Sequence, residues 1–441
     1  MNQYLPHTAG DIDAMLASCG LKSLDDLYAD VPAELRLKRE YALDKGLSEQ
    51  EVADFFEHLA AKNNVMPVCL AGNGFYDHYS PSVVAALASR SEFSTAYTPY
   101  QPEISQGTLQ YIFEYQSMMA SLTGLDISNA SMYDATTAAA EAMMMCVAAA
   151  RRRNRVLVSA TLLPAMRAVL DTYARYHGVV IGEIADDGGV TSLDDMKEQL
   201  AKGDVAGVIL PQPNRHGIVE DLTGFADAIH GAKALMVMAG PASPLALLKT
   251  PGEWGADIAV GDGQSLGIPV SYGGPAIGYM TCRQSLMRKM PGRIVGVTND
   301  ARGNRVMVLT LQAREQHIRR NKATSNICSN QGLMALYVTI YMALLGPDGL
   351  RRVNELSRDG AVYLADQLSA TGRMRLAYPD KPFFNEFEME TDLDIDELRR
   401  QAASRGILAG VKVAPNRLLL AVTERQSRNQ LDEFVNIVKN L

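Results

Sequence analysis

The stretch that decides the fold runs from residue 92 to residue 142, EFSTAYTPYQPEISQGTLQYIFEYQSMMASLTGLDISNASMYDATTAAAEA. Pro99 and Pro102 restrict the chain around them to extended conformations, because proline fixes φ and disfavours helix in the residue before it. From Ser105 onward, apolar residues recur at helical spacing until Gly124, which occupies the usual position of a helix C-cap. The stretch therefore predicts an extended aromatic segment followed by a helix.

A second helix is predicted after the Ser/Asn-rich connection that follows Gly124. Asp134, Thr136 and Thr137 precede the apolar run 138–150, and such residues cap helix N-termini. The free N–H groups of a helix N-terminus can bind a phosphate, but most capped helices bind none. The residues alone leave both interpretations open.

Composition excludes several classes of function. The chain has 441 residues, 47% of them apolar, and a formal net charge of −8, which disfavours a nucleic-acid partner. Its five cysteines lie apart with no CxxC motif, as expected of reduced thiols without a metal site. The N-terminus lacks the pattern of a signal peptide, and no apolar run is expected to span a bilayer. We therefore expect a cytoplasmic protein that has no membrane partner.

The remaining sequence predicts three regions. Residues 1–65 form short amphipathic helices, an N-terminal helical arm. Residues 66–330 alternate apolar strands with helices, which indicates a mostly parallel sheet covered on both faces. Residues 331–441 begin with a long apolar helix, broken at Gly346-Pro347, and continue as a small α+β domain. The strands expected in the large α/β domain are Arg155–Ser159, Val179–Ile184, Val205–Leu210, Ala234–Ala239, Asp257–Gly261 and Ala276–Cys282.

Three motifs carry a resemblance to a known family. They are TAYTPYQPEISQGTLQ at 95–110, NASMYD at 129–134 and LQAREQHIRRNKATSNICSNQ at 311–331. The chain is similar to the glycine-cleavage P-protein family, and more narrowly to the alpha subunit, or N-terminal half, of its bacterial two-subunit form. The resemblance implies a pyridoxal phosphate (PLP) dependent transferase fold of type I, which is aspartate-aminotransferase-like, with a large domain and a small C-terminal domain.

The residues that anchor PLP in this fold are missing. No lysine occurs between Lys249 and Lys289, although PLP enzymes need one for the internal aldimine. By resemblance to the catalytic beta subunit, Gln264 falls at the lysine position. No Asp or Glu occurs from residue 234 to residue 252, where an acid for the pyridinium nitrogen is expected. We therefore expect the chain's own PLP pocket to be empty, with a degenerate phosphate cup at Ser131, Asp134, Thr136 and Thr137.

The resemblance implies an α2β2 assembly in which the beta subunit holds PLP and the working cleft lies at the αβ interface. Two segments are suited to face that cleft. The alternatives are a surface loop whose tyrosines pack against the large domain, and a solvated charged helix face. The candidate residues are Tyr97, Thr98, Tyr100, Glu103 and Gln106 in the first segment, and Arg314, His317, Arg319 and Arg320 in the second.

The first functional interpretation is a subunit of glycine decarboxylase that does not anchor PLP. The complete enzyme would decarboxylate glycine and pass the aminomethyl group to the lipoamide of H-protein. A second is a self-sufficient PLP-dependent lyase or aminotransferase that uses Lys249, Lys289 or Lys322. A third is a regulatory or scaffolding homodimer of the same fold. The fold alone does not choose among them.

Overall fold

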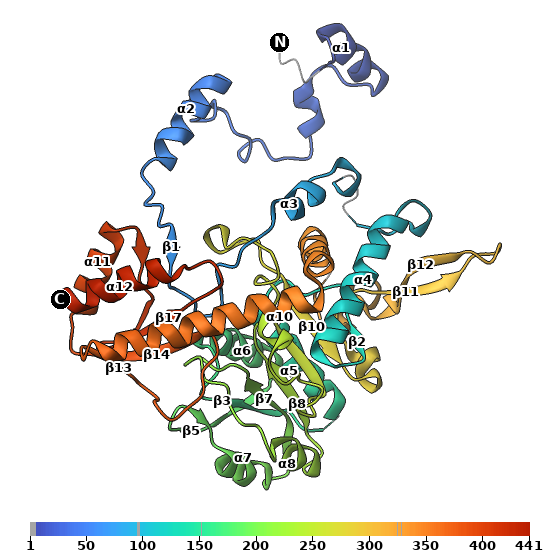
Figure 1. The fold of residues 1–441 in the computed structure, drawn as a ribbon. Coiled ribbons are helices and arrows are strands. Elements are labelled where there is room, and N and C mark those ends of the chain that lie inside the picture. The colour runs from blue at the N-terminus through green and yellow to red at the C-terminus, as the bar shows by residue number, and fades with distance from the viewer. Residues whose placement is uncertain (1–5, 95–97, 151, 324, 328) are drawn as a thin grey trace. The chain divides into compact units, whose positions relative to one another are not determined.

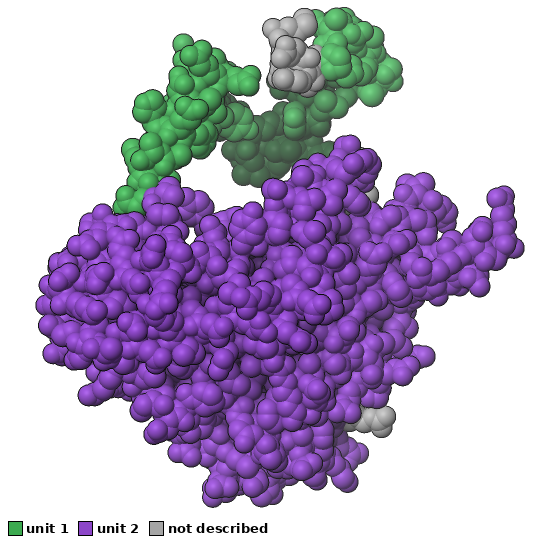
Figure 2. All heavy atoms as spheres, in the orientation of Figure 1, with its two compact units in different colours: residues 1–64 green, residues 65–441 purple. Residues whose placement is uncertain are grey.

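The computed structural model describes residues 6–94, 98–150, 152–323, 325–327 and 329–441. The chain divides into two compact units, residues 1–64 and residues 65–441 (Figure 2). The predicted division of the second unit near residue 330 stays a prediction, because the long helix α10 (Gly332–Ala370) contributes buried residues to the cores on both sides of that boundary.

The first unit consists of short helices without a core of their own. It contains α1 (Ala9–Ser18), a 3₁₀ turn (Leu24–Tyr28) and α2 (Glu49–Ala60). The capping box expected at Ser48 and Glu51 is present: the Glu51 N–H donates to Ser48 Oγ and the Ser48 N–H donates to a Glu51 carboxylate oxygen. Leu16 is the only buried side chain among the described residues of this unit.

The second unit is built on a seven-stranded sheet in the order β2-β10-β9-β8-β7-β3-β4 (Figure 1). The five strands from β9 to β4 are parallel, and β10 runs antiparallel to both of its neighbours. This confirms the predicted mostly parallel sheet. The strands are β2 (Ile127–Ser128), β3 (Arg155–Ser159), β4 (Val180–Ile184), β7 (Val205–Pro211), β8 (Leu235–Ala239), β9 (Ile258–Asp262) and β10 (Gly278–Cys282).

Helices cover both faces of this sheet because its strands are apolar on both sides. In β3, Val156 and Val158 belong to the core formed with α5 and α6, whereas Leu157 belongs to the core formed with α7 and α8. The helix α4 packs with α10 over the β9–β10 side of the sheet. The helices of this region are α3 (Ser82–Ala88), α4 (Gln106–Thr123), α5 (Ala135–Ala150), α6 (Pro164–His177), α7 (Leu193–Leu200) and α8 (Phe225–Gly231).

The C-terminal part forms a second, antiparallel sheet of four strands in the order β13-β14-β17-β16. It packs with the second half of α10 and with α11 and α12. Gly346, at φ 61° and ψ −175°, interrupts α10 just before Pro347, as predicted. The elements are β13 (Met374–Leu376), β14 (Glu386–Thr391), α11 (Ile395–Ser404), β15 (Ile407–Leu408), β16 (Val411–Ala414), β17 (Arg417–Ala421) and α12 (Arg428–Asn440).

Several elements of the structure are not predicted by the sequence patterns. The hairpin of β11 (Ile294–Asn299) and β12 (Arg305–Thr310) extends from the body of the unit (Figure 1). The apolar run Val306–Leu311 predicts its second strand, and no pattern predicts its first. The strand β1 (Val68–Cys69) corresponds to no predicted element and pairs with β15, more than 330 residues away. The short β5 (Asp186–Asp187) and β6 (Val190–Thr191) are also unpredicted, whereas α9 (Gln316–Arg319) lies in the segment for which a charged helix face was one alternative.

The expectation that no apolar run is long enough to span a bilayer is wrong for one helix, judged by its length and composition. The helix α10 contains an 18-residue window of mean hydropathy 1.4, which is enough for a membrane span. In this structure 44% of that window is buried, and the helix contributes Leu336, Val338 and Tyr341 to a core cluster. The same apolar composition therefore also suits a core helix.

The exposure of the first unit generates a stability prediction. Removing residues 1–64 should leave the melting temperature within about 2 °C of that of the full chain, because surface residues that bury little contribute little to unfolding. Calorimetry of both proteins tests this. A fall of many degrees would mean that residues 1–64 contribute to the stability of the folded chain.

Candidate functional site

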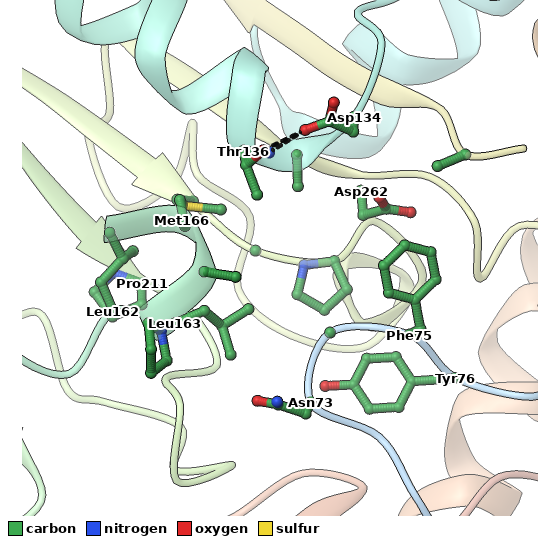
Figure 3. Close-up of a pocket in the computed structure, with 18 of the residues that line it drawn as sticks. Asn73, Phe75, Tyr76, Asp134, Thr136, Leu162, Leu163, Met166, Pro211 and Asp262 are labelled. Atoms are coloured by element: carbon green, nitrogen blue, oxygen red, sulfur yellow. Dashed lines mark hydrogen bonds between the residues drawn. The ribbon is translucent and has the colours of Figure 1, made fainter. Parts of the chain in front are cut away.

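A cavity of about 570 Å³ lies where three adjacent parallel strands end (Figure 3). Pro211 ends β7, Ala239 ends β8 and Asp262 ends β9, and all three line the cavity. Ligands of open α/β sheets bind outside the carboxyl ends of the strands. The other walls come from the loop at residues 73–76, the first turns of α5 and α6, and the loop at residues 273–276.

Two carboxylates occupy the N-terminus of α5 at the wall of this cavity. Asp134 Oδ1 accepts hydrogen bonds from the N–H groups of Thr136 at 2.8 Å and Thr137 at 2.9 Å (Figure 3). Asp262 Oδ1 accepts the N–H of Gln264 at 2.6 Å, and Asp262 is also hydrogen-bonded by the backbone of Ala135. The helix N–H groups that could hold a phosphate are therefore already paired with carboxylate oxygens of the chain itself.

Burial changes the titration of the acids in this cavity. It raises the pKa of Asp262 from 3.8 to about 7, assisted by the charge of Asp134 and opposed by the hydrogen bond from Gln264 N–H. Burial likewise raises the pKa of Glu386 to about 7, although the Asn73 N–H and the Tyr76 hydroxyl both donate to its carboxylate. No Lys, Arg or His is among the residues that line the cavity, all of which the structure describes.

Gln264 has a structural role in this arrangement. Its side chain is 2% exposed and does not line the cavity. Its Nε2 donates to the carbonyl oxygens of Tyr76 at 3.1 Å and Ile268 at 2.7 Å, and its Oε1 accepts the N–H of Tyr76 at 3.1 Å. A glutamine cannot form a Schiff base. This cavity, with no lysine and an acidic helix terminus, does not fit PLP.

The hydroxyls expected at the phosphate cup are also engaged. Ser131, at φ 121°, is fully buried and its Oγ accepts the N–H of Gln331 at 3.0 Å. The hydroxyls of Thr136 and Thr137 both donate to Asp134. Ser131 and Thr137 do not line the cavity, whereas Asp134 and Thr136 do. A phosphate role for this group stays a prediction.

The aromatic segment is only partly directed toward solvent. Tyr97 lies outside the described residues. Thr98 Oγ1 is buried without a hydrogen-bond partner, Tyr100 is 51% exposed and Glu103 is exposed. The Gln106 amide pairs with both backbone groups of Met307, at 2.9 Å and 2.8 Å, so it supports the hairpin from which β12 comes.

The structure separates the basic residues of the second segment. Arg314 and Arg319 border a cavity of about 180 Å³ together with Arg288 and Lys289, whereas Arg320 borders a different cavity. Arg314 donates to the carbonyl oxygens of Leu311 and Gly292, and burial lowers its pKa. His317 is about half exposed, with Nδ1 3.4 Å from the Glu315 carboxylate. An active-cleft role for these residues stays a prediction.

Sequence reasoning did not single out two acids of the main cavity, Asp262 and Glu386. Asp262 follows a predicted strand directly, so its place at the end of that strand could have been a signal. Glu386 enters from β14, more than 120 residues farther along the chain, and no local pattern predicts its position.

The raised pKa of Asp262 generates a pH prediction. Between about pH 4 and pH 7 the folded chain holds a proton on Asp262 that the unfolded chain has lost, so this group makes the free energy of unfolding fall as pH rises. Asp262→Asn removes this decrease in the free energy of unfolding, because asparagine does not ionise. The variant should therefore be more stable than the wild type by about 1–3 kcal/mol at pH 8, but little more stable at pH 5. Urea unfolding at both values measures the difference. The exposed Asp187→Asn is the control, and equal effects of both variants would contradict the assignment.

A second prediction concerns Gln264. Gln264→Ala leaves the buried Ile268 carbonyl oxygen and the Tyr76 N–H without partners, whereas the Tyr76 carbonyl oxygen keeps the His78 N–H, so the free energy of unfolding should fall by about 2–3 kcal/mol. Urea unfolding measures the loss. An unchanged midpoint would show that water replaces the amide at no cost, and the structural role of Gln264 would be wrong.

Comparison of the sequence with known proteins points to one family. The family model of the glycine cleavage system P-protein matches residues 2–438. The chain is 47% identical over 444 residues to a probable glycine dehydrogenase (decarboxylating) subunit 1 of Moorella thermoacetica, with 99% of each chain covered. It is 46% identical to the protein of the same name from Desulforamulus reducens, with 98% of each chain covered.

Solved structures agree with the sequence relatives. The chain is similar to the crystal structure of glycine decarboxylase (P-protein) of the glycine cleavage system in inhibitor-bound form, with a TM-score of 0.92, 43% identity and 99% of each chain covered. Mouse CSAD, at a TM-score of 0.70 and 13% identity, shows only that the fold is shared. The fold is the predicted type I fold of PLP-dependent enzymes, and the chain belongs to the glycine cleavage system P-protein family.

Proposed function

We propose that this chain is the subunit of a glycine-decarboxylating enzyme that does not anchor PLP. The observation that carries the proposal is Gln264, which follows the strand β9 where a lysine is needed and whose amide is fully used by backbone groups. The cavity beside it supports the same conclusion, because carboxylate oxygens of Asp134 and Asp262 already accept the backbone N–H groups that a phosphate would need.

The chemistry of the P-protein family depends on PLP. In the proposed assembly a second subunit holds the cofactor, two copies of each chain form an α2β2 complex, and the lipoyl group of H-protein accepts the aminomethyl group after glycine loses CO2. The complex acts in the cytoplasm. Names of the relatives support the second subunit, since they call each relative a subunit 1.

The contribution of this chain is to complete a cleft rather than to carry the cofactor. Tyr100 presents a half-exposed phenol, and Arg319 and Arg320 present exposed guanidinium groups. Guanidinium groups bind carboxylates and phosphates through paired N–H donors. These side chains are suited to orient an anionic substrate or to contact the acidic surface of a carrier.

Borohydride trapping separates this proposal from a self-sufficient PLP enzyme. The purified chain, alone and with its partner subunit, is incubated with PLP, reduced, digested and searched by mass spectrometry for a pyridoxyl-lysine peptide. We expect a stoichiometric adduct on the partner and none here. A stoichiometric adduct at Lys249, Lys289 or Lys322 would overturn the proposal.

Reconstitution separates it from a regulatory or scaffolding role. Exchange of labelled bicarbonate into glycine is measured with H-protein and the partner subunit, with and without this chain. Dependence of the exchange on this chain supports the proposed function. Full exchange without it would show that glycine cleavage does not need this subunit.

A further inference from the structure

Arg293 is a buried arginine whose charge has no partner among the residues that the structure describes. Its side chain is 3% exposed, in the turn just before β11. In the described part of the chain, no carboxylate lies within ion-pair distance of it, and its Nε has no hydrogen-bond partner. Because guanidinium groups stay protonated in proteins, the free-energy cost of burying the charge cannot be avoided by loss of a proton.

The contacts that Arg293 does make are weak. Nη1 lies 3.4 Å from Asn330 Oδ1, and Nη2 lies 3.4 Å from the hydroxyl oxygen of Tyr100. Both distances exceed the usual 2.7–3.2 Å of N–H···O hydrogen bonds. The guanidinium carbon also lies 5.2 Å from the centre of the Tyr100 ring. A buried charge normally has a counter-charge or strong hydrogen bonds, and Arg293 has neither.

The two sides of Arg293 are covered by different parts of the chain. The backbone of Arg293 is bonded to Ala130, whose carbonyl oxygen also accepts from Asn330 Nδ2 at 3.0 Å, so the inner side is closed by protein. Tyr100 covers the other side and is 51% exposed. In the same aromatic segment, Thr98 Oγ1 is a second buried polar atom without a partner.

We infer that Arg293 is the anchor of a carboxylate-binding site whose outer wall is the side chain of Tyr100. A carboxylate offers two acceptor oxygens and one negative charge, which match the fork of N–H donors of a guanidinium group. The inference deepens the proposed function, on which it rests, because the carboxylate comes from outside this chain: either from glycine in the shared cleft or from an acidic side chain of the partner subunit.

The test compares Arg293→Met with Arg305→Met in the full chain. Arg305 is a matched control because its guanidinium group also lies over an aromatic ring, that of Phe113, but the residue is exposed. For the chain alone we expect Arg293→Met to melt at the same temperature as the wild type or higher, because a buried charge without a counter-ion is replaced by an apolar side chain of similar length.

In the complex with the partner subunit and H-protein, Arg293→Met should lose about tenfold or more in one of two constants. If the carboxylate belongs to glycine, KM for glycine rises while the Kd between the subunits is unchanged. If it belongs to the partner, Kd rises while KM at saturating partner is unchanged. Arg293→Lys keeps the positive charge without the paired N–H donors of the guanidinium group, so the same constant should change by a smaller factor. Arg305→Met should have the Kd and KM of the wild type.

Two results would overturn the inference. One is a lower melting temperature of the isolated Arg293→Met chain, which would make the arginine an internal structural support. The other is wild-type Kd and KM for that variant. Both results differ from the result that would contradict the proposed function. That result is glycine exchange by the partner subunit and H-protein without this chain.

Discussion

The structure depends on how the loop at residues 72–78 is held between the two sheets. Gln264, at the end of β9, bonds the backbone of Tyr76, while the Tyr76 hydroxyl and the Asn73 N–H donate to Glu386 of β14. One loop therefore connects the seven-stranded sheet to the four-stranded sheet across the main cavity. Gly72 permits this approach, since a Cβ there would lie 2.2 Å from a Glu386 oxygen. The position expected to hold a catalytic lysine is used to fasten the loop.

Side chains of the chain itself also set the electrostatics of the main cavity. The N-terminus of α5 keeps its free N–H groups and its favourable dipole for negative charge, but Asp134 and Asp262 of the chain itself occupy them. The cavity has the position of a ligand pocket of this fold, but its helix N–H groups are already paired with side chains of the chain itself. The proposed role in assembly and orientation needs only the fold.

Two of the buried polar groups that lack a partner lie outside the main cavity. In the described part of the chain, Arg293 is buried without a counter-charge and Thr98 Oγ1 is buried without a hydrogen-bond partner. Buried polar groups are normally paired, and we infer that a carboxylate from outside the chain supplies the counter-charge of Arg293.

The sequence by itself determined the parallel strands, the capped helix at Asp134, the break at Gly346-Pro347 and the absence of a lysine after β9, because periodicity, capping residues and residue identity are local properties. Tertiary structure alone decided that β1 pairs with β15, that Glu386 enters the main cavity, that Gln106 supports the hairpin and that no described carboxylate pairs with Arg293. Each of these joins residues far apart in the chain. Whether a charge is paired depends on which side chains surround it after folding, and no spacing in the sequence records that.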